Sequence, residues 1–505
     1  MFFSQALLAL PAFVGLSAAE KALNQSAEYD SGVLGASPTQ KYVAATDFKP
    51  VLLNYQLPIN ESTLDKVSPG LLFFAPQGER VVEQSGPLIV KQDGTLVWSG
   101  AEYASPSFHV EQYKGEDHII LWTRTSDLHI GGYGHGRWIV LNNAYEVVAN
   151  YSTVGLLNDT LADFHDSHLY DGELATMTAY LTQPYDLSKY GGPTDGFITS
   201  AVVQEINLTS NEPLFTWNSL DHVDPADSYY SLPEGAGTNY SSAWDYFHIN
   251  TIDKDAAGNY LLSSRYLHTI FYIDGTSGDI IWRLGGKNSS FTLGEGVEFQ
   301  WQHDTRWRSN NTISLFDNAG REEEEDAPYS RSLLLSVDFD AKTVELLKEF
   351  IPWNRTQGVS HSQGNAQFLE NGNVIVGYGQ QPFFQEFDSD GNSLWEVHFG
   401  VGNVQAYRAY RFNWTGLPSA SPSFSVVGDS SNRTGYAWWN GATELASWEL
   451  FGSSGADAVS LVNTSRTDFE TPIAFDSWGN YTSYKVVALD SEGQVLGRSE
   501  DVSPV

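Results

Sequence analysis

The sequence predicts an all-β protein. Aromatic residues make up 13% of its 505 residues, Gly is frequent at 45 copies, and runs of good helix formers are few. Short apolar segments alternate with Gly, Asn and Asp turns throughout the first four hundred residues. A chain of this length is too long for one ordinary core, so it needs several domains or one large repeat architecture.

The repeat is a pair of strands that closes on an acidic or Gly turn followed by an aromatic residue. Its six copies recur at intervals of about 45 to 65 residues, the spacing of propeller blades. They span Gly86–Trp98, Trp138–Asn150, Val202–Trp217, Ile270–Trp282, Leu333–Phe350 and Phe384–Trp395.

A short apolar strand precedes each copy, and a further strand precedes most of those. The apolar strands are expected at Leu71–Ala75, His118–Thr123, Leu174–Tyr180, Tyr260–Arg265, Thr312–Asp317 and Val374–Tyr378. Four strands cannot bury both faces alone, but six such units around an axis can. We therefore expect a six-bladed β-propeller over residues 20–412.

Residues 413–505 lack the repeat. Pro418, Pro422 and Gly428 mark the boundary, and short alternating strands are expected near Ser423–Val427, Tyr436–Trp439, Ala446–Leu450 and Tyr484–Leu489. These strands predict a small β-sandwich similar to fibronectin type III domains. Within the propeller, the stretch Asn218–Tyr246 is a long insertion, either a lid or a surface loop.

The chain is expected to be secreted. Residues 1–19 fit a signal peptide, with an apolar run shorter than the ~20 residues of a membrane span. No later segment or C-terminal signal predicts a membrane anchor, and there is no Cys. Thirteen sequons predict N-linked glycans on exposed positions: Asn24, Asn60, Asn150, Asn158, Asn207, Asn239, Asn288, Asn310, Asn354, Asn413, Asn432, Asn463 and Asn480.

The net charge of −35 argues against nucleic acid as a partner, because an acidic surface repels phosphate. The acidic run from Glu322 to Asp326 is interpreted as a solvated loop. A small aromatic or anionic substrate is the expected partner.

Histidines recur at the starts of the innermost strands. His109, His165, His248 and His303 each precede the next apolar strand by about ten residues, and His361 has a similar place in the sixth repeat. Inner strands line a propeller's central channel, so we expect these imidazoles to converge at one mouth of it. The alternative is a structural histidine copied with the repeat.

Converging imidazoles can bind a metal, relay protons or act as nucleophiles. No metal is expected, because signatures such as H-E-x-x-H are absent, although Asp163 with His165 or His303 with Asp304 leave that option open. No cofactor is expected either, because the sequence has no P-loop and no dinucleotide fingerprint.

Several motifs, in this order, resemble the arylsulfotransferase family, and more closely its secreted fungal branch. They are Phe247-His248-Ile249-Asn250, Ser263-Ser264-Arg265, Gln302-His303-Asp304, Phe316-Asp317-Asn318 with Arg321, Asn371-Gly372-Asn373 and Tyr407-Arg408-Ala409. The resemblance covers roughly residues 40 to 415 and implies a six-bladed propeller.

The resemblance also implies sulfuryl transfer from an aryl sulfate to a phenol through a sulfated histidine, with no nucleotide donor. The catalytic residues it implies are His248, His303, Arg321 and His165. The substrate-binding residues are Arg265, His361, Arg408, Trp301 and Tyr246.

One position departs from the family pattern. In bacterial members the sulfated histidine directly precedes the Tyr-Arg-Ala motif, and here that position is Ala406. Either His165 or His361 takes over as nucleophile, or the chemistry differs. The alternatives are a lyase, hydrolase or cyclase acting on an aromatic secondary metabolite, or a non-catalytic extracellular binding propeller.

Overall fold

The computed structural model describes residues 20–78, 83–125, 132–156, 160–355, 358–429, 432–455, 457–476, 478 and 480–503. The predicted signal peptide and the sequon at Asn158 lie outside these residues. Helix in the described residues is confined to α1 (Ala27–Asp30) and 3₁₀ turns at Leu64–Lys66, Ala101–Tyr103, Ser188–Tyr190, Ser219–Asp221, Pro225–Asp227 and Tyr240–Ser242. The predicted all-β class is confirmed. None of the described helices is long and apolar enough to cross a membrane.

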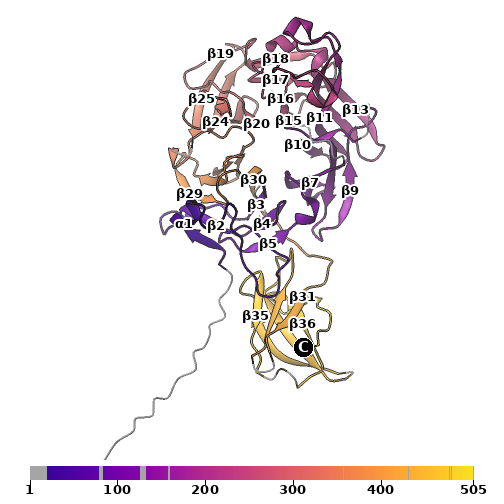
Figure 1. Ribbon diagram of the computed structural model, residues 1–505, viewed down its shortest axis with the longest axis vertical. Coiled ribbons are helices and arrows are strands. Elements are labelled where there is room, and N and C mark those ends of the chain that lie inside the picture. The colour runs from indigo at the N-terminus through magenta and orange to yellow at the C-terminus, as the bar shows by residue number, and fades with distance from the viewer. Residues whose placement is uncertain are drawn as a thin grey trace, which may run out of the picture.

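Most of the strands form antiparallel sheets arranged around a ring (Figure 1). One four-stranded sheet contains β15 (Ile249–Lys254), β16 (Tyr260–Ser264), β17 (Thr269–Ile273) and β18 (Ile280–Gly285), in that order. The next contains β20 (His303–Ser309), β21 (Thr312–Asp317), β24 (Arg331–Asp338), β25 (Thr343–Phe350) and β19 (Thr292–Leu293). A separate ribbon joins β22 (Gly320–Arg321) to β23 (Glu324–Glu325).

A nine-stranded sheet consists of two consecutive groups of strands. The first contains β6 (Phe108–Tyr113), β7 (Glu116–Arg124), β8 (Gly136–Leu141) and β9 (Val147–Tyr151). The second contains β10 (Ala162–Tyr170), β11 (Leu174–Tyr185), β12 (Gly196–Asn207), β13 (Glu212–Asn218) and β14 (Trp244–Asp245). The single pairing of Ala162 with Gly136 connects the two groups.

Strands from the two ends of the ring-forming segment share sheets. β30 (Gln405–Phe412) pairs with β3 (Leu71–Gln77), which continues into β4 (Leu88–Val90) and β5 (Leu96–Ser99). β2 (Leu53–Leu57) pairs with β29 (Ser393–His398), in the sheet that also holds β1 (Ala22–Asn24), β28 (Phe383–Phe387), β27 (Val374–Gly377) and β26 (Asn365–Phe368). Early and late strands therefore hold the ring together.

The strands expected from the sequence are present. The apolar strands correspond to β3, β7, β11, β16, β21 and β27. Each predicted outer pair forms an antiparallel pair, as in β17 with β18 and β28 with β29. The signal was reliable because buried strand residues and turn residues alternate at a fixed period.

Buried polar side chains join the innermost strands of neighbouring sheets. Asp166 on β10 accepts a hydrogen bond from the backbone N–H of Ile252 on β15 (2.9 Å). Asp304 on β20 does the same for Ala366 on β26 (2.9 Å). These contacts satisfy backbone groups that the sheets leave unpaired at their inner edges.

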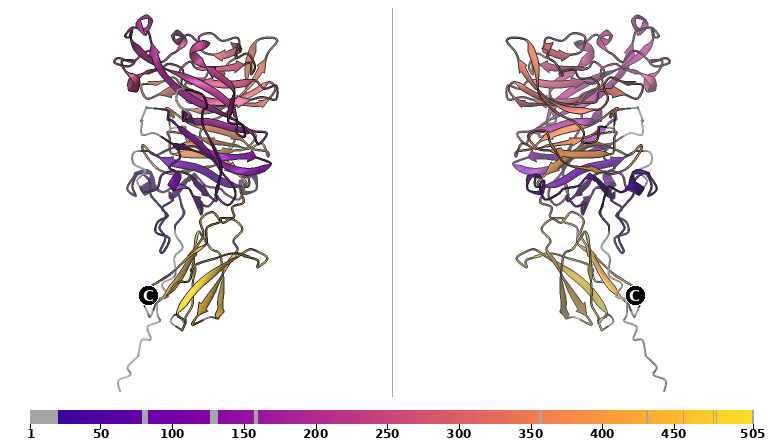
Figure 2. Two further views of the ribbon diagram at one scale, coloured as in Figure 1. Left: turned by 90° about the vertical axis from the view of Figure 1, so that its right-hand side faces the viewer. Right: turned by 90° about the vertical axis from the view of Figure 1, so that its left-hand side faces the viewer.

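The C-terminal strands form two further sheets beside the ring (Figures 1 and 2). One holds β31 (Ser423–Val427), β32 (Thr434–Trp438) and β35 (Glu470–Ile473). The other holds β34 (Ala458–Ser465), β33 (Ser447–Ser453), β36 (Ser483–Leu489) and β37 (Val495–Arg498). Both contribute to one buried cluster that includes Phe424, Trp448 and Tyr484.

Specific hydrogen bonds fasten this region to the ring. The Glu470 carboxylate accepts bonds of 2.7–2.8 Å from the backbone N–H groups of residues 43, 44 and 45. The Asn440 side chain exchanges hydrogen bonds with the backbone of Ser99. These contacts connect the C-terminal sheets to the ring.

Candidate active site

Backbone irregularities at the inner strands place three of the predicted histidines at one cavity. The pairing register shifts at His165 in β10, at the start of β15 just after His248, and beside His303 in β20. His248 and Asp304 also have positive φ (52° and 51°). Bulges of this kind turn side chains out of the regular alternation and are common next to active sites.

The cavity has a volume of about 510 Å³. His165, His248 and His303 line it together with Arg265, Arg321 and His361. Aromatic residues form much of the remaining wall, namely Phe164, Tyr133, Tyr230, Tyr266 and Tyr407. The insertion Asn218–Tyr246 contributes Tyr230, whose ring stacks on that of Tyr266 with centroids 4.4 Å apart.

His165 and His248 form two similar pairs with aspartates. Nδ1 of His248 is 2.6 Å from Oδ2 of Asp245, and Nδ1 of His165 contacts Oδ1 of Asp163. Because a carboxylate only accepts hydrogen bonds, Nδ1 carries the proton in both rings. Nε2 of each ring has no hydrogen-bond partner among the described residues. Each histidine can therefore present an Nε2 lone pair to the cavity.

The two imidazoles are neighbours but differ in surroundings. Their ring centroids are 5.1 Å apart in an edge-to-face arrangement. Burial lowers the pKa of His248, although Asp245 opposes this shift, and the charge of Arg265 lowers it further. His165 stacks on Phe164, with ring centroids 4.5 Å apart. The neutral form of His248 is thus favoured.

His303 is held differently. Its Nδ1 is 2.6 Å from Oδ1 of Asn318, whose amide nitrogen donates to two backbone carbonyls and so fixes the orientation of the oxygen. Its Nε2 accepts the backbone N–H of Gln363 (3.2 Å). Both ring nitrogens are therefore engaged, and burial keeps the pKa of His303 well below its usual range. The ring lines the cavity as a neutral group with no free lone pair.

Arg265 is the buried cation of the cavity. Its side chain donates to the backbone carbonyl of His361 (2.5 Å) and lies over the rings of Tyr266 and Trp301. No carboxylate of the described residues is within ion-pair distance of it, and its buried Nε has no partner. Burial lowers the pKa of this guanidinium, but arginine stays protonated in proteins. An unpaired buried charge is unfavourable, so this cavity favours an anion.

Arg321 and His361 lie at the cavity together with carboxylates. Arg321 Nη1 is 2.8 Å from Glu323 and its guanidinium also lies over Trp301. His361 Nε2 is 3.2 Å from Glu325. The acidic run therefore pairs with two predicted site residues, which reduces the positive charge that they offer to a ligand.

The structure places the remaining predicted residues outside the cavity wall. Arg408 is buried and pairs with Asp166 (2.8 Å) and Asp304 (3.7 Å), so its charge is already compensated. Tyr246 is a core residue whose hydroxyl donates to Ser219. Trp301 packs behind Arg265 and Arg321 and donates to Asp326. Trp301 thus acts on a ligand only through the two arginines.

His109 does not join the other three histidines. β6 pairs with β7 without a register shift, so no bulge redirects the His109 side chain as it does for His165. It lies beside Glu111 and His168 instead. The expectation that all four imidazoles share one channel mouth is wrong for this residue.

Ala406 is buried in an apolar cluster, whereas the next residue, Tyr407, lines the cavity. Alternation along β30 explains the difference, because neighbouring strand residues point to opposite faces. A side chain at position 406 is therefore directed into the core.

Asp245, which holds His248, was not predicted as a site residue, and Asp163 was named only as part of a possible metal-binding set with His165. Asp163 and Asp245 precede their histidines by two and three residues, and each also accepts the backbone N–H of its histidine. An Asp two or three residues before His165 and His248, which is absent before His109 and His303, is the sequence signal that could have identified these two aspartates. The tyrosines at 230 and 266 carry no such signal, because only the fold brings them to the cavity.

Comparison with known protein families identifies one family that this chain matches. Residues 109–400 match the arylsulfotransferase (ASST) family. The chain belongs to the arylsulfotransferase family. The match includes the strands that carry the three cavity histidines, Arg265 and Arg321, and it ends just before Tyr407. The resemblance stated from sequence motifs is confirmed at the level of the family.

No curated protein matches this arylsulfotransferase-family chain significantly. Solved structures with a similar course include a Bacteroides caccae protein of unknown function (12% identity, 68% of this chain and 98% of that chain, TM-score 0.38). The Myceliophteria thermophila Cps50 (Swd1) β-propeller domain is 12% identical, with 70% of this chain and 89% of that chain covered and a TM-score of 0.30. The Pseudomonas aeruginosa periplasmic gluconolactonase PpgL is 10% identical, with 86% of this chain and 96% of that chain covered and a TM-score of 0.35.

Proposed function

We propose that this protein transfers a sulfuryl group from an aryl sulfate to a phenol, with a histidine as the intermediate carrier. The observation that carries the proposal is Arg265, a buried guanidinium without a carboxylate partner, beside two histidines with free Nε2 atoms. An aryl sulfate supplies the anion that Arg265 lacks. Its ring suits the aromatic wall formed by Phe164, Tyr230 and Tyr266.

His248 is the proposed nucleophile, because it adjoins Arg265 across the β15–β16 pair and its neutral form is favoured. Its Nε2 lone pair attacks the sulfur, and the bond from sulfur to the aryl oxygen breaks. The departing oxygen takes a proton from Nε2 of His165, which enters this step as an imidazolium with the Asp163 carboxylate as its counter-ion. The ring of sulfated His248 keeps its Nδ1 proton, and the Asp245 carboxylate stabilises the positive charge that develops on the ring.

The second step reverses these roles with a different phenol. His165, now unprotonated at Nε2, takes the proton of the acceptor hydroxyl, and the phenol oxygen attacks the sulfur. The bond from nitrogen to sulfur breaks, and His248 regains its lone pair. No nucleotide donor is needed, because the aryl sulfate itself supplies the sulfuryl group and His248 carries it to the acceptor phenol.

The proposal includes the architecture that surrounds the site. We propose a six-bladed propeller over residues 20–412 and a β-sandwich similar to fibronectin type III over residues 413–505. Six successive four-strand groups, from β3 to β30, support the blade count. Two sheets around one buried cluster support the sandwich.

The test of the function is a chromogenic aryl sulfate, supplied with and without a phenol acceptor. We expect release of the chromogenic phenol that accelerates when the acceptor is present, together with a sulfated acceptor. Without acceptor, mass spectrometry of peptides should find one added SO₃ group on His248. If the rate of phenol release does not depend on the acceptor and inorganic sulfate is the product, the protein is instead a hydrolase.

We also propose that the protein is a secreted glycoprotein of the family's fungal branch. The support is the leader-like composition of residues 1–19 and the position of the sequons. Every described sequon asparagine is exposed except Asn207, which is half-buried. Endoglycosidase treatment of protein recovered from the medium should lower its apparent mass by several glycans, and an unchanged band would contradict this proposal.

A further inference from the structure

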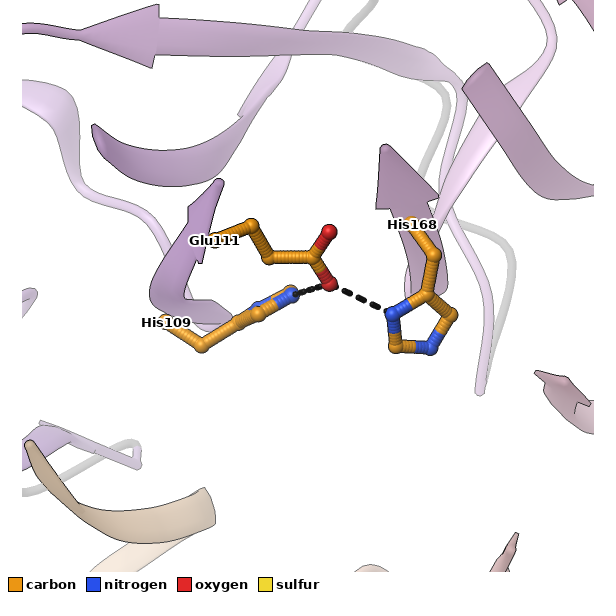
Figure 3. A group of neighbouring side chains, drawn as sticks. All are labelled: His109, Glu111 and His168. Carbon is orange, nitrogen blue, oxygen red and sulfur yellow. Dashed lines mark hydrogen bonds and ion pairs between the residues drawn. The ribbon is translucent and has the colours of Figure 1, made fainter. Parts of the chain in front are cut away.

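His109 and Glu111 on β6 and His168 on β10 form a second histidine cluster (Figure 3). Oε1 of Glu111 is 3.0 Å from Nε2 of His109 and 2.5 Å from Nδ1 of His168. The three potential ligand atoms all lie within 4.8 Å of one another. His168 follows His165 by three residues on β10, a separation on the order of 10 Å along a strand.

Neighbouring groups fix the orientation of this cluster. The other Glu111 oxygen accepts the backbone N–H of Leu169 (2.7 Å). Nε2 of His168 is 3.5 Å from Oδ2 of the fully buried Asp166 and 2.7 Å from Nη1 of Arg306. Arg306 is itself paired with Asp166 and Asp304. Carboxylates and backbone groups behind the ligands are what metal sites use to orient them.

The ion pairs around the cluster leave Glu111 without an arginine or lysine partner among the described residues. Asp166 and Asp304, by contrast, are paired with Arg306 and Arg408. One carboxylate, Glu111, therefore has only the two imidazoles as side-chain partners.

We propose that His109, Glu111 and His168 bind a divalent transition-metal ion, for which zinc is the probe. Two imidazole nitrogens with one carboxylate oxygen suit zinc and its neighbours, whereas calcium and magnesium prefer sites built from oxygen. The inference does not depend on sulfuryl transfer, because none of the three residues lines the active-site cavity.

Binding requires the protons that now face Glu111 to move to the other ring nitrogens. On His168 the proton shifts from Nδ1 to Nε2, so the 2.7 Å hydrogen bond from Arg306 Nη1 to Nε2 is given up and Asp166 accepts from Nε2 instead. Arg306 keeps its 2.8 Å bond to the carbonyl of Ile252. The ion would then join β6 directly to β10. We expect it to stabilise the two strands that meet here and to leave the active-site histidines unchanged.

The experiment uses the full-length protein, stripped with a chelator and titrated with zinc, cobalt, calcium or magnesium. We expect one equivalent of zinc by calorimetry and elemental analysis, a visible absorption band with cobalt, and a higher unfolding temperature with zinc. Calcium and magnesium should have no effect. Glu111→Gln and His168→Asn should each weaken zinc binding by about 10–100-fold or more.

His118→Gln is the matched control. His118 is a buried histidine on β7, beside β6, and its Nδ1 contacts a backbone carbonyl outside the cluster. Zinc affinity should be unchanged in this variant. The proposal is overturned if the unmodified protein binds no zinc with 1:1 stoichiometry, or if His118→Gln weakens binding as much as His168→Asn. In either case Glu111 and the two imidazoles form only a hydrogen-bonded triad.

Discussion

Replacing Arg265 by methionine is expected to slow sulfuryl transfer strongly without lowering the unfolding temperature. Methionine keeps the volume of the side chain but removes a buried charge that has no carboxylate partner. Losing one group that stabilises transition-state charge lowers kcat/KM by about 10²–10³-fold. Stability should stay the same or rise, because an unpaired buried charge is unfavourable in the folded protein.

Arg408→Met is the matched control for this variant, because Arg408 is similarly buried but its charge is paired with Asp166 and Asp304. Its removal leaves Asp166 and Asp304 with less compensation, which is expected to destabilise the protein by about 3–5 kcal/mol. Sulfate should raise the unfolding temperature of the unmodified protein but not that of Arg265→Met. Retained activity in Arg265→Met would remove this residue from the site.

Arg321→Ala distinguishes the contribution of Arg321 to catalysis from that of Arg265. Because Glu323 and Glu324 already pair with Arg321 at a partly exposed position, its loss should reduce kcat/KM much less than the loss of Arg265. A larger effect of Arg321→Ala would show that a ligand displaces these carboxylates on binding.

The contrast between Arg265 and Arg408 shows what the sequence could predict about the site. Both arginines were recognised from motifs, and both are buried. The sequence could not separate them, because their difference depends on carboxylates from distant strands. Asp166 and Asp304 reach Arg408 only after the inner strands of the ring have come together.

The histidines show that the sequence predicts the position of a residue on a strand better than the direction of its side chain. Their regular position at inner strands predicted that they would converge, and this is correct for His165, His248 and His303. It is wrong for His109, because a register shift is present in β10 but absent from the pairing of β6 with β7. A bulge depends on local backbone geometry that strand periodicity does not encode, and the proximity of His109 to His168 was therefore not predicted either.

The repeat itself was predictable because it depends on local patterns. Alternating apolar residues and fixed turns identify β16, β21 and β27 without knowledge of their neighbours. The aromatic wall was not predictable, because Tyr230 reaches the cavity from the insertion after β13. No spacing within the sequence relates that residue to the inner strands.

Replacing His248 or His165 by alanine is expected to block different steps. His248→Ala should lower kcat/KM on the order of 10³-fold or more and form no sulfated protein, because the nucleophile is missing. His165→Ala should still release one equivalent of phenol from a donor with a good leaving group. It should then stall, because no base remains to take the proton of the acceptor.

The dependence on pH provides an independent check on the nucleophile. Burial lowers the pKa of His248, so the unprotonated ring persists below pH 6.5, the usual pKa of histidine. Single-turnover release from a good leaving group should therefore remain constant as the pH falls through 6.5 and decline only at lower pH.

Asp245→Asn also tests the assignment of His248 as the nucleophile, because it changes the partner of the His248 ring. The Asp245 carboxylate raises the pKa of His248, so its removal should move the acidic decline to still lower pH. The rate at the plateau should also fall, because the amide does not stabilise the positive charge of the sulfated ring. Asp163→Asn serves as the control, since it should leave the pH dependence of this first step in place and slow transfer to the acceptor. If the acidic decline of the first step shifts in Asp163→Asn and not in Asp245→Asn, His165 is the nucleophile.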